Sequence, residues 1–346
     1  MKTGSKYGTH RVIEPKGVLP QAAQKINNTM DIYDNEILID VKALNIDSAS
    51  FTQLKQTNDN NPELVGNAIL EIVNQRGKMQ NPVTGSGGML IGTIKQIGSK
   101  LEKTHDLKVG DSIATLVSLS LTPLNIKAIT KIHMDIDRVE IDGQAILFES
   151  GIFAKLPEDM DESLALAALD VAGAPAQVAK LVKPGDTVLI LGASGKSGML
   201  CSYEAMKRVG PTGRVIGAVI DEANKQQLVD LNLCHDYIVG DAKDSMFVYK
   251  ELVRITDGRE CDIAINCVNV PDTEMSTILP VRDDGVAYFF SMATSFTKAT
   301  LGAEGVGKDV VMIMGNGYTK GHAEITLSEL RENKALRDIY EKIYVL

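Results

Sequence analysis

The segment that most constrains the fold of this chain is TVLILGASGKSGML, residues 187–200, in which an apolar run leads into a turn with three glycines. A short continuous apolar run is typical of a strand that is buried on both faces of a parallel sheet. Glycines between such a strand and a following helix let the backbone approach a phosphate group closely. The phosphate belongs either to a nucleoside triphosphate or to a dinucleotide, and the residue spacing separates these interpretations.

The spacing does not fit a nucleoside triphosphate. The loop that binds a triphosphate has the form G-x-x-x-x-G-K-[ST]. Gly195, Lys196 and Ser197 supply the end of that pattern, but the residue five positions before Gly195 is Ile190, inside the predicted strand. The loop is therefore too short to wrap a triphosphate.

The same turn fits a dinucleotide-binding fold. Ala193, Gly195 and Gly198 occupy the frame of G-x-G-x-x-G, and Gly192 adds a glycine one position earlier. Such a turn reverses the chain, admits the pyrophosphate and points the first N–H groups of the helix at it. The predicted cofactor-binding residues of this turn are Gly192, Ser194, Gly195, Lys196, Ser197 and Gly198.

An acidic residue follows the second apolar run of this half, RVIGAVI at 214–220. We expect Asp221 to end that strand and to accept hydrogen bonds from the adenosine ribose hydroxyls. A 2′-phosphate would meet the negative charges of Asp221 and Glu222, so NAD is favoured over NADP. Lys196 and Lys225 would moderate this preference.

The second half of the chain predicts a doubly wound parallel sheet. Short apolar runs separated by helical stretches are expected to form strands at 187–191, 214–220, 236–240, 261–268, 285–290 and 309–314. Six strands in this arrangement are typical of a Rossmann dinucleotide-binding domain.

The first half is predicted to be mostly strand and turn, as in an irregular β barrel. Strands are expected at 35–46, 87–98 and 108–121. The fold class is therefore α/β with a second, barrel-like domain. We expect a catalytic and substrate domain over 1–155, and a Rossmann domain over 156–346 that includes a linking helix at 161–182 and a closing amphipathic helix at 325–346.

Composition excludes several classes of partner. The 346 residues are 44% hydrophobic and 23% charged, and the net charge is −9. This acidity argues against nucleic acid or an anionic membrane as partner. No secretory signal and no apolar run of roughly 18 residues is found, so we expect a cytoplasmic protein. The cysteines lack a Cys-x-x-Cys pair and are expected to be reduced, buried thiols: Cys201, Cys234, Cys261 and Cys267.

Taken together, these patterns make the chain resemble the medium-chain dehydrogenase/reductase superfamily. The matching pieces occur in the family's order: NEILIDVKALNI, GGMLIGTIKQIG, KVGD, the linking helix, and GASGKSG before RVIGAVID. The resemblance implies a chaperonin-10-like barrel followed by a Rossmann domain, hydride chemistry in the cleft between them, and a homodimer.

The chain departs from the zinc-using members of that superfamily. Asp47 is nearest to the position of their first cysteine ligand, TGSGGM at 84–89 replaces their Gly-His-Glu, and the third ligand position falls near Asp170. One or two carboxylates without the histidine make a poor zinc site. We expect no metal.

The N-terminal stretch YGTHRVIEPKGVLPQAAQKINN, residues 7–28, points to one family within this superfamily. It is similar to the L-erythro-3,5-diaminohexanoate dehydrogenase family of bacterial lysine fermentation. That resemblance implies NAD(P)-dependent oxidative deamination of (3S,5S)-3,5-diaminohexanoate to 5-amino-3-oxohexanoate and ammonia. Loss of zinc fits this reaction, because a neutral amine can give up hydride without a metal-bound alkoxide.

A substrate with two ammonium groups and one carboxylate calls for acidic residues and a cation. The candidate catalytic residues are Asp47, Asp170 and, as an alternative acid/base, His10. The candidate substrate-binding residues are Arg11, Lys16, Ser48, Thr84 and Ser86. Purely structural roles are open for all of them: Asp47 as a turn cap, Asp170 on an exposed helix face, and the cations as surface charges.

The nicotinamide end of the cofactor is expected near the ends of two later strands. Cys267 and Asn269 follow the strand CDIAIN, and Ser291 follows the next one. Packing alone would also explain Cys267.

Two other functions stay open. A zinc-free NAD(P)H-dependent quinone or enoyl reductase would share this architecture and favour an apolar cleft. A non-catalytic NAD-binding sensor would keep GASGKSG without needing acidic and cationic groups near the cofactor.

Overall fold

The computed structural model describes residues 2–102, 107–315 and 317–345. The chain divides into two compact units, Met1–Glu158 and Asp159–Leu346. The division lies a few residues beyond the boundary expected after residue 155. Each unit is described by itself.

The second unit contains one parallel sheet of six strands in the order β11-β10-β9-β12-β13-β14. Its strands are β9 (Thr187–Leu191), β10 (Arg214–Val219), β11 (Asp236–Val239), β12 (Cys261–Asn266), β13 (Val281–Phe289) and β14 (Val311–Met314). The predicted strands and the doubly wound order are confirmed. The order reverses between β9 and β12, the point at which such sheets bind their ligands.

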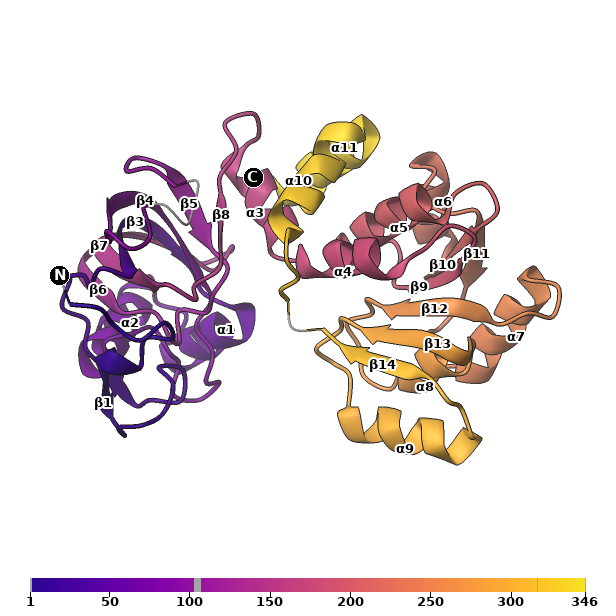
Figure 1. Cartoon of the computed structure of the whole chain (residues 1–346), viewed down its shortest axis with the longest axis horizontal. Coiled ribbons are helices and arrows are strands. Elements are labelled where there is room, and N and C mark those ends of the chain that lie inside the picture. The colour runs from indigo at the N-terminus through magenta and orange to yellow at the C-terminus, as the bar shows by residue number, and fades with distance from the viewer. Residues whose placement is uncertain (1, 103–106, 316, 346) are drawn as a thin grey trace. The chain divides into compact units, whose positions relative to one another are not determined.

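Helices cover both faces of this sheet (Figure 1). On one face lie α4 (Gly173–Leu181), α5 (Lys196–Val209) and α6 (Glu222–Asp230), and on the other α7 (Ser245–Ile255), α8 (Glu274–Ile278) and α9 (Phe296–Val306). Asp244 and Ser295 cap the N-termini of α7 and α9 by accepting backbone hydrogen bonds. Central strand residues such as Leu189 and Ala264 are completely buried between the two helical layers.

The linking segment is two helices and not the single helix expected at 161–182. Helix α3 (Glu162–Leu169) ends at Asp170, and α4 begins at Gly173. The two axes differ by 53°. The apolar pattern runs through both helices, so the break is not visible as a change in hydrophobicity.

The C-terminal segment also divides into two helices. Helix α10 (His322–Glu332) is followed by α11 (Lys334–Tyr344), where one helix was expected over 325–346. Asn333 causes the break, because its side chain accepts a hydrogen bond from the Leu336 N–H and starts a new helix. Both helices pack on their own unit, α10 against α4 and α5, and α11 against α3.

No single helix in the described part of the chain has both the length and the apolar character to cross a membrane. The bent pair α3 and α4 meets those criteria only when its two helices are counted together.

The first unit is built on an antiparallel sheet of six strands in the order β6-β7-β3-β4-β5-β8. These are β3 (Glu36–Asn45), β4 (Met89–Ile97), β5 (Ser112–Thr115), β6 (Leu124–His133), β7 (Arg138–Phe148) and β8 (Phe153–Lys155). Register shifts interrupt the pairing of β3 with β4 and of β6 with β7. Such irregularities bend a sheet, as expected of an irregular barrel.

The N-terminal arm forms a separate small element. It contains the 3₁₀ helix η1 (Thr9–Arg11) and a two-stranded ribbon of β1 (Val12–Glu14) and β2 (Lys25–Ile26). The buried Lys78 holds this arm by donating to the Pro20 carbonyl at 2.6 Å.

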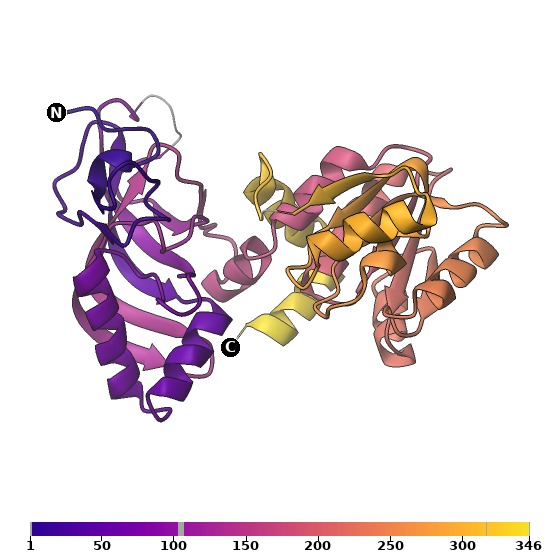
Figure 2. The same cartoon turned by 90° about the horizontal axis from the view of Figure 1, so that it is seen from below.

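Two helices in the first unit were not expected from the sequence. Helix α1 (Ser48–Thr57) is capped by Asp47, and α2 (Pro62–Arg76) begins after Asn61 and ends at Gly77, whose φ is 72°. Both helices lie beside the sheet of the first unit (Figure 2), and their apolar residues belong to its core. The sequence contains signals for α2: an Asn-Pro start, a glycine end, and apolar residues at positions 65, 69 and 73.

Candidate functional site

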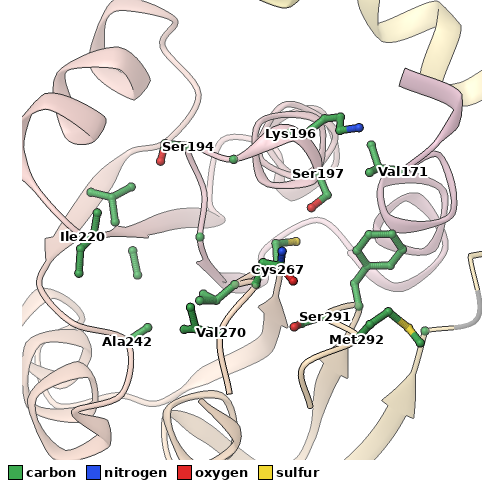
Figure 3. A pocket seen from close by; sticks show the side chains of 18 of the residues that line it. Val171, Ser194, Lys196, Ser197, Ile220, Ala242, Cys267, Val270, Ser291 and Met292 are labelled. Atoms are coloured by element: carbon green, nitrogen blue, oxygen red, sulfur yellow. The ribbon is translucent and has the colours of Figure 1, made fainter. Parts of the chain in front are cut away.

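A cavity of about 900 Å³ lies in the second unit at the carboxyl ends of the parallel strands (Figure 3). Residues that follow β9, β10, β11, β12, β13 and β14 all contribute to its wall. Apolar atoms provide most of its surface, and a few polar side chains interrupt them. A site of this size at the switch point of a doubly wound sheet suits a dinucleotide.

The glycine turn forms one wall of this cavity, and its three glycines are required for different reasons. Gly192 has a φ of 75°, which favours glycine. Gly195 precedes α5 and leaves room in front of the helix. A Cβ on Gly198 would lie 2.1 Å from the Gly192 carbonyl oxygen, so only glycine lets α5 pack this closely on the turn.

Helix α5 begins at the cavity with Lys196 and Ser197 (Figure 3). The first backbone N–H groups of a helix have no partner within the helix and attract anions. Ser194, also in the wall, donates from its hydroxyl to the Asn224 side chain at 2.9 Å. Five of the six residues predicted for the turn line the cavity. The sixth, Gly198, lies outside the lining and packs against the Gly192 carbonyl.

Asp221 occupies a different position from the one expected. Strand β10 ends at Val219, and Asp221 caps α6 by accepting from the Asn224 backbone N–H and side-chain amide, both at 2.8 Å. These hydrogen bonds hold the pKa of its carboxyl below the ordinary value. The wall of the cavity here is formed by Val219 and Ile220, so Asp221 lies beside the cavity and not in its lining.

The predicted nicotinamide-side residues all lie in the cavity wall. Cys267 and Asn269 follow β12, and Ser291 follows β13. Met292 lies next to Ser291 and has 88% of its surface exposed (Figure 3). An exposed methionine beside a cavity offers an apolar surface to a ligand.

Asp170 also lies in the wall, but it already has a cationic partner. Its carboxylate accepts from the Lys196 ammonium at 2.7 Å. Lys196 also lies over the Tyr344 ring, 5.5 Å from its centre, and its backbone carbonyl accepts from the Tyr340 hydroxyl. The last helix of the chain thus holds the residue that begins α5.

In the first unit, His10 and Arg11 are engaged with a buried acid, Glu36. Arg11 donates to both carboxylate oxygens, at 2.7 and 2.6 Å, and His10 Nε2 lies 2.8 Å from Oε1. Burial would raise the pKa of Glu36, but hydrogen bonds from Arg11, His10 and the Tyr33 N–H lower it to about 2.

This network explains why Arg11 is a poor ligand for a substrate carboxylate. The side chain is 2% exposed and also donates to the backbone carbonyls of Thr29 and Asp31. His10 accepts a hydrogen bond from the Ser5 N–H on its other ring nitrogen. Lys16, in contrast, is exposed. His10 and Arg11 therefore hold the N-terminal arm to Glu36, and their polar atoms are already engaged within the first unit.

Asp47 combines a structural role with an unused polar atom. Its Oδ1 accepts from the Ser50 N–H at 3.1 Å, which caps α1. Its Oδ2 is buried and has no hydrogen-bond partner among the described residues, and the same holds for Asn45 Oδ1. A buried carboxylate oxygen without a donor is costly and is suited to receive a donor from a ligand.

Thr84 and Ser86 belong to the segment that contacts the start of α1, whereas Ser48 is the exposed first residue of that helix. The Thr84 hydroxyl is 2.5 Å from the Ser50 hydroxyl and accepts from the Ser86 N–H. A Cβ on Gly88 would lie 2.8 Å from the Asp47 nitrogen, so this glycine lets the 84–88 segment pack against Asp47.

Several lining residues were missed by sequence reasoning. They share one property, since each lies at the carboxyl end of a strand of the parallel sheet or in the loop that follows it: Val219, Ile220, Asp241, Ala242, Val270 and Gly315. Applying the strand-end rule to every strand would have found them. Asn45, the last residue of β3 in the first unit, was also not predicted, because nothing in its sequence pattern distinguishes it from other strand-end residues.

Within the described residues there is no group of three or more His, Cys, Asp or Glu side chains that is placed to hold a metal ion.

Comparison with known proteins gives two kinds of similarity. Residues 10–157 match the family model described as the L-erythro-3,5-diaminohexanoate dehydrogenase N-terminal domain. The chain is 67% identical to L-erythro-3,5-diaminohexanoate dehydrogenase of Acetoanaerobium sticklandii over 342 residues, 99% of both chains. It is 65% identical to the protein of the same name from Fusobacterium nucleatum subsp. nucleatum over 345 residues, 100% of both chains.

Solved structures show the same fold at low identity. The CurK enoyl reductase has a TM-score of 0.54 and 17% identity, with 94% of this chain and 85% of that chain covered. A 2-haloacrylate reductase has a TM-score of 0.53 and 17% identity, with 94% and 87% covered. The predicted fold class, a Rossmann domain with a β-rich N-terminal domain, is confirmed.

Proposed function

The chain belongs to the L-erythro-3,5-diaminohexanoate dehydrogenase family, and we propose that it oxidatively deaminates L-erythro-3,5-diaminohexanoate to 5-amino-3-oxohexanoate and ammonia with a nicotinamide cofactor. The observation that carries this proposal is identity of 67% and 65% over the full length of two dehydrogenases of that name. The dinucleotide-sized cavity supports it independently.

The cavity residues fit the parts of a dinucleotide. We assign the pyrophosphate to the start of α5, at Gly195, Lys196 and Ser197, where the first N–H groups of the helix lie beside the Lys196 ammonium. The adenosine half would lie against Ile220 and Ala242. The nicotinamide, which accepts hydride when bound, would lie toward the end that contains the residues Cys267, Asn269, Ser291 and Met292.

We propose NAD as the preferred cofactor, with NADP as a weaker alternative. The exposed carboxylates Asp221 and Glu222 follow Ile220 directly and would repel a 2′-phosphate. Lys225 is the nearest cation in sequence, and it already pairs with Glu222 at 3.0 Å.

The reaction requires a substrate amine that is neutral when hydride leaves, because an ammonium has no electron pair to form the imine. We propose that Asp47 receives a proton or a hydrogen bond from a substrate ammonium, since its buried Oδ2 has no partner among the described residues. Asp170 would stabilise positive charge near the nicotinamide end. Its ion pair with Lys196 would reduce the negative charge that it presents to the substrate. Lys16 stays the candidate for the substrate carboxylate.

The first test is absorbance at 340 nm with purified protein, the diamino acid and either NAD or NADP, together with an ammonia assay. We expect NADH and ammonia in equal amounts and faster turnover with NAD. Dinucleotide binding without any turnover would contradict the substrate assignment. Faster turnover with NADP would contradict the role of Asp221 and Glu222.

We also propose that the chain forms a homodimer. Strand β14 lies at the edge of the parallel sheet, and Val311 and Met314 on it are 55% and 40% exposed. An exposed apolar edge strand is a ready surface for pairing with a second copy. Light scattering should give a dimer for the wild type and a monomer for Val311→Lys. A monomeric wild type would contradict the proposal.

A further inference from the structure

We propose that Cys267 is an oxidant-reactive thiol, which peroxide converts together with Cys201 into a disulfide that weakens dinucleotide binding. The deamination chemistry uses neither thiol. Only the inhibitory consequence depends on the proposed function, because it requires that the cavity beside Cys267 binds a dinucleotide.

The two thiols are already close together. Cys201 Sγ and Cys267 Sγ are 3.9 Å apart, although the residues are 66 positions apart in the sequence. Cys201 is buried on α5, whereas Cys267 is half-buried and lies in the cavity wall (Figure 3). A disulfide has a sulfur–sulfur distance of about 2.0 Å, so bond formation needs a displacement of roughly 2 Å.

The surroundings give the two thiols different reactivities. Hydrogen bonding by Cys201 and by the Ser197 hydroxyl lowers the pKa of Cys267 despite burial. Ser197 is in the first turn of α5, where the helix dipole also favours a thiolate. Burial raises the pKa of Cys201 well above its usual value. Cys267 is therefore the attacking thiolate, and Cys201 is the resolving thiol.

The reaction has two steps. The Cys267 thiolate attacks one peroxide oxygen, the O–O bond breaks, and a sulfenic acid and hydroxide form. The Cys201 thiol then attacks the sulfenic sulfur, the S–O bond breaks, and the hydroxyl leaves with the thiol proton as water. Peroxide takes up the two electrons that the pair of thiols loses.

The position of Cys267 connects this reaction to the cofactor site. A Cβ built on Gly192 would lie 3.1 Å from the Cys267 carbonyl carbon, so Cys267 packs directly against the glycine turn. Drawing Cys267 toward α5 would therefore disturb the turn at which we place the pyrophosphate. In the opposite direction, a bound dinucleotide would cover Cys267 and slow its oxidation.

The experiment compares wild type, Cys201→Ala and the matched control Cys234→Ser, which alters a buried cysteine away from the cavity. Each protein is treated with hydrogen peroxide with and without NAD. Peptide mass mapping then identifies the cross-link, and titration with NAD measures affinity before and after dithiothreitol.

We expect a Cys201–Cys267 cross-link in wild type and Cys234→Ser, a roughly tenfold loss of NAD affinity, and recovery with dithiothreitol. Cys201→Ala should form no cross-link and should instead carry a dimedone adduct on Cys267. Bound NAD should protect all three proteins. A cross-link at another pair, an unchanged affinity after cross-linking, or no protection by NAD would each overturn the proposal.

The two proposals fail separately. If untreated wild type binds NAD but does not turn over the diamino acid, the proposed substrate is wrong, while the cross-link and the binding data still test the thiol pair.

Discussion

The Tyr340 hydroxyl donates a hydrogen bond to the carbonyl oxygen of Lys196, so the last helix of the chain supports the first residue of the helix that faces the dinucleotide cavity. Tyr340 is completely buried. The residues are 144 positions apart. The C-terminal helix is thus part of the structure that positions the glycine turn.

Tyr340→Phe should therefore weaken dinucleotide binding. The substitution keeps the ring but removes the hydroxyl that donates to the part-buried Lys196 carbonyl, a loss of about 1 kcal/mol. We expect a several-fold higher Kd for NAD and a lower free energy of unfolding, measured by titration and urea denaturation. Tyr344→Phe, which keeps the aromatic ring below the Lys196 ammonium, is the control and should bind NAD normally.

Two glycine substitutions should separate binding from folding. A Cβ on Gly195 would lie 3.4 Å from its nearest neighbour, the Gly192 carbonyl oxygen, so Gly195→Ala should fold but obstruct the pyrophosphate. Gly198→Ala places a Cβ 2.1 Å from that oxygen and should destabilise the unit itself.

Melting temperatures and NAD titration distinguish these outcomes. Gly305→Ala is the control, because this exposed glycine within α9 has free space around it. The substitution should raise the free energy of unfolding by about 0.5–1 kcal/mol. Normal NAD binding by Gly195→Ala would place the pyrophosphate elsewhere.

Asp47→Asn tests the proposed acid. Asparagine is also a good helix N-cap, so α1 should be preserved while the negative charge is lost. We expect kcat/KM for the diamino acid to fall by roughly 100-fold, in the range of a lost general base, with an unchanged melting temperature. Ser48→Ala, at the neighbouring exposed position, should retain activity. If Asp47→Asn were as active as Ser48→Ala, Asp47 would act only as the N-cap of α1 and not as the proposed acid.

Glu36 should make the first unit sensitive to acid. Its pKa of about 2 in the folded chain is below the ordinary 4.5, so its contribution to stability is complete above pH 4.5 and is lost as the pH falls toward 2. Glu36→Gln should lower the free energy of unfolding by about 3 kcal/mol at pH 7. Urea denaturation at several pH values should show this difference shrinking below pH 4. A constant difference would contradict the assignment.

Glu329 should have the opposite effect. Both of its carboxylate oxygens are buried without a hydrogen-bond partner among the described residues, and burial with nearby Glu204 raises its pKa well above the usual value. An acid with a raised pKa reduces stability as the pH rises above its ordinary value. Glu329→Gln should therefore stabilise the protein by at least about 1 kcal/mol at pH 8, with little effect at pH 4. Glu304→Gln, at an exposed position, should change stability little at either pH.

Local patterns were sufficient for the Rossmann unit. The apolar runs, the glycine spacing and the helices between them specify a parallel sheet, and the strand-end rule then identifies Gly192, Lys196 and Cys267 as cavity residues. These features are readable because the strand, turn and helix that form the phosphate site are contiguous in the sequence. The resemblance to the diaminohexanoate dehydrogenase family was equally local, since it depended on residues 7–28.

Contacts between distant residues determined the rest. Arg11 and His10 looked available in the sequence, but Glu36 lies 25 and 26 positions away and engages both side chains. Asp221 looked like a strand end, but the hydrogen bonds of Asn224 draw it to the start of α6 and away from the cavity wall. The unpaired Oδ2 of Asp47 and the Cys201–Cys267 pair depend on how separate elements pack. The strands of the parallel sheet and the position of the dinucleotide turn could be predicted from the sequence, because hydrophobic period and glycine spacing are local properties. Only the tertiary structure decided which polar side chains remain free for a ligand, because a hydrogen-bond partner can come from any distance along the chain.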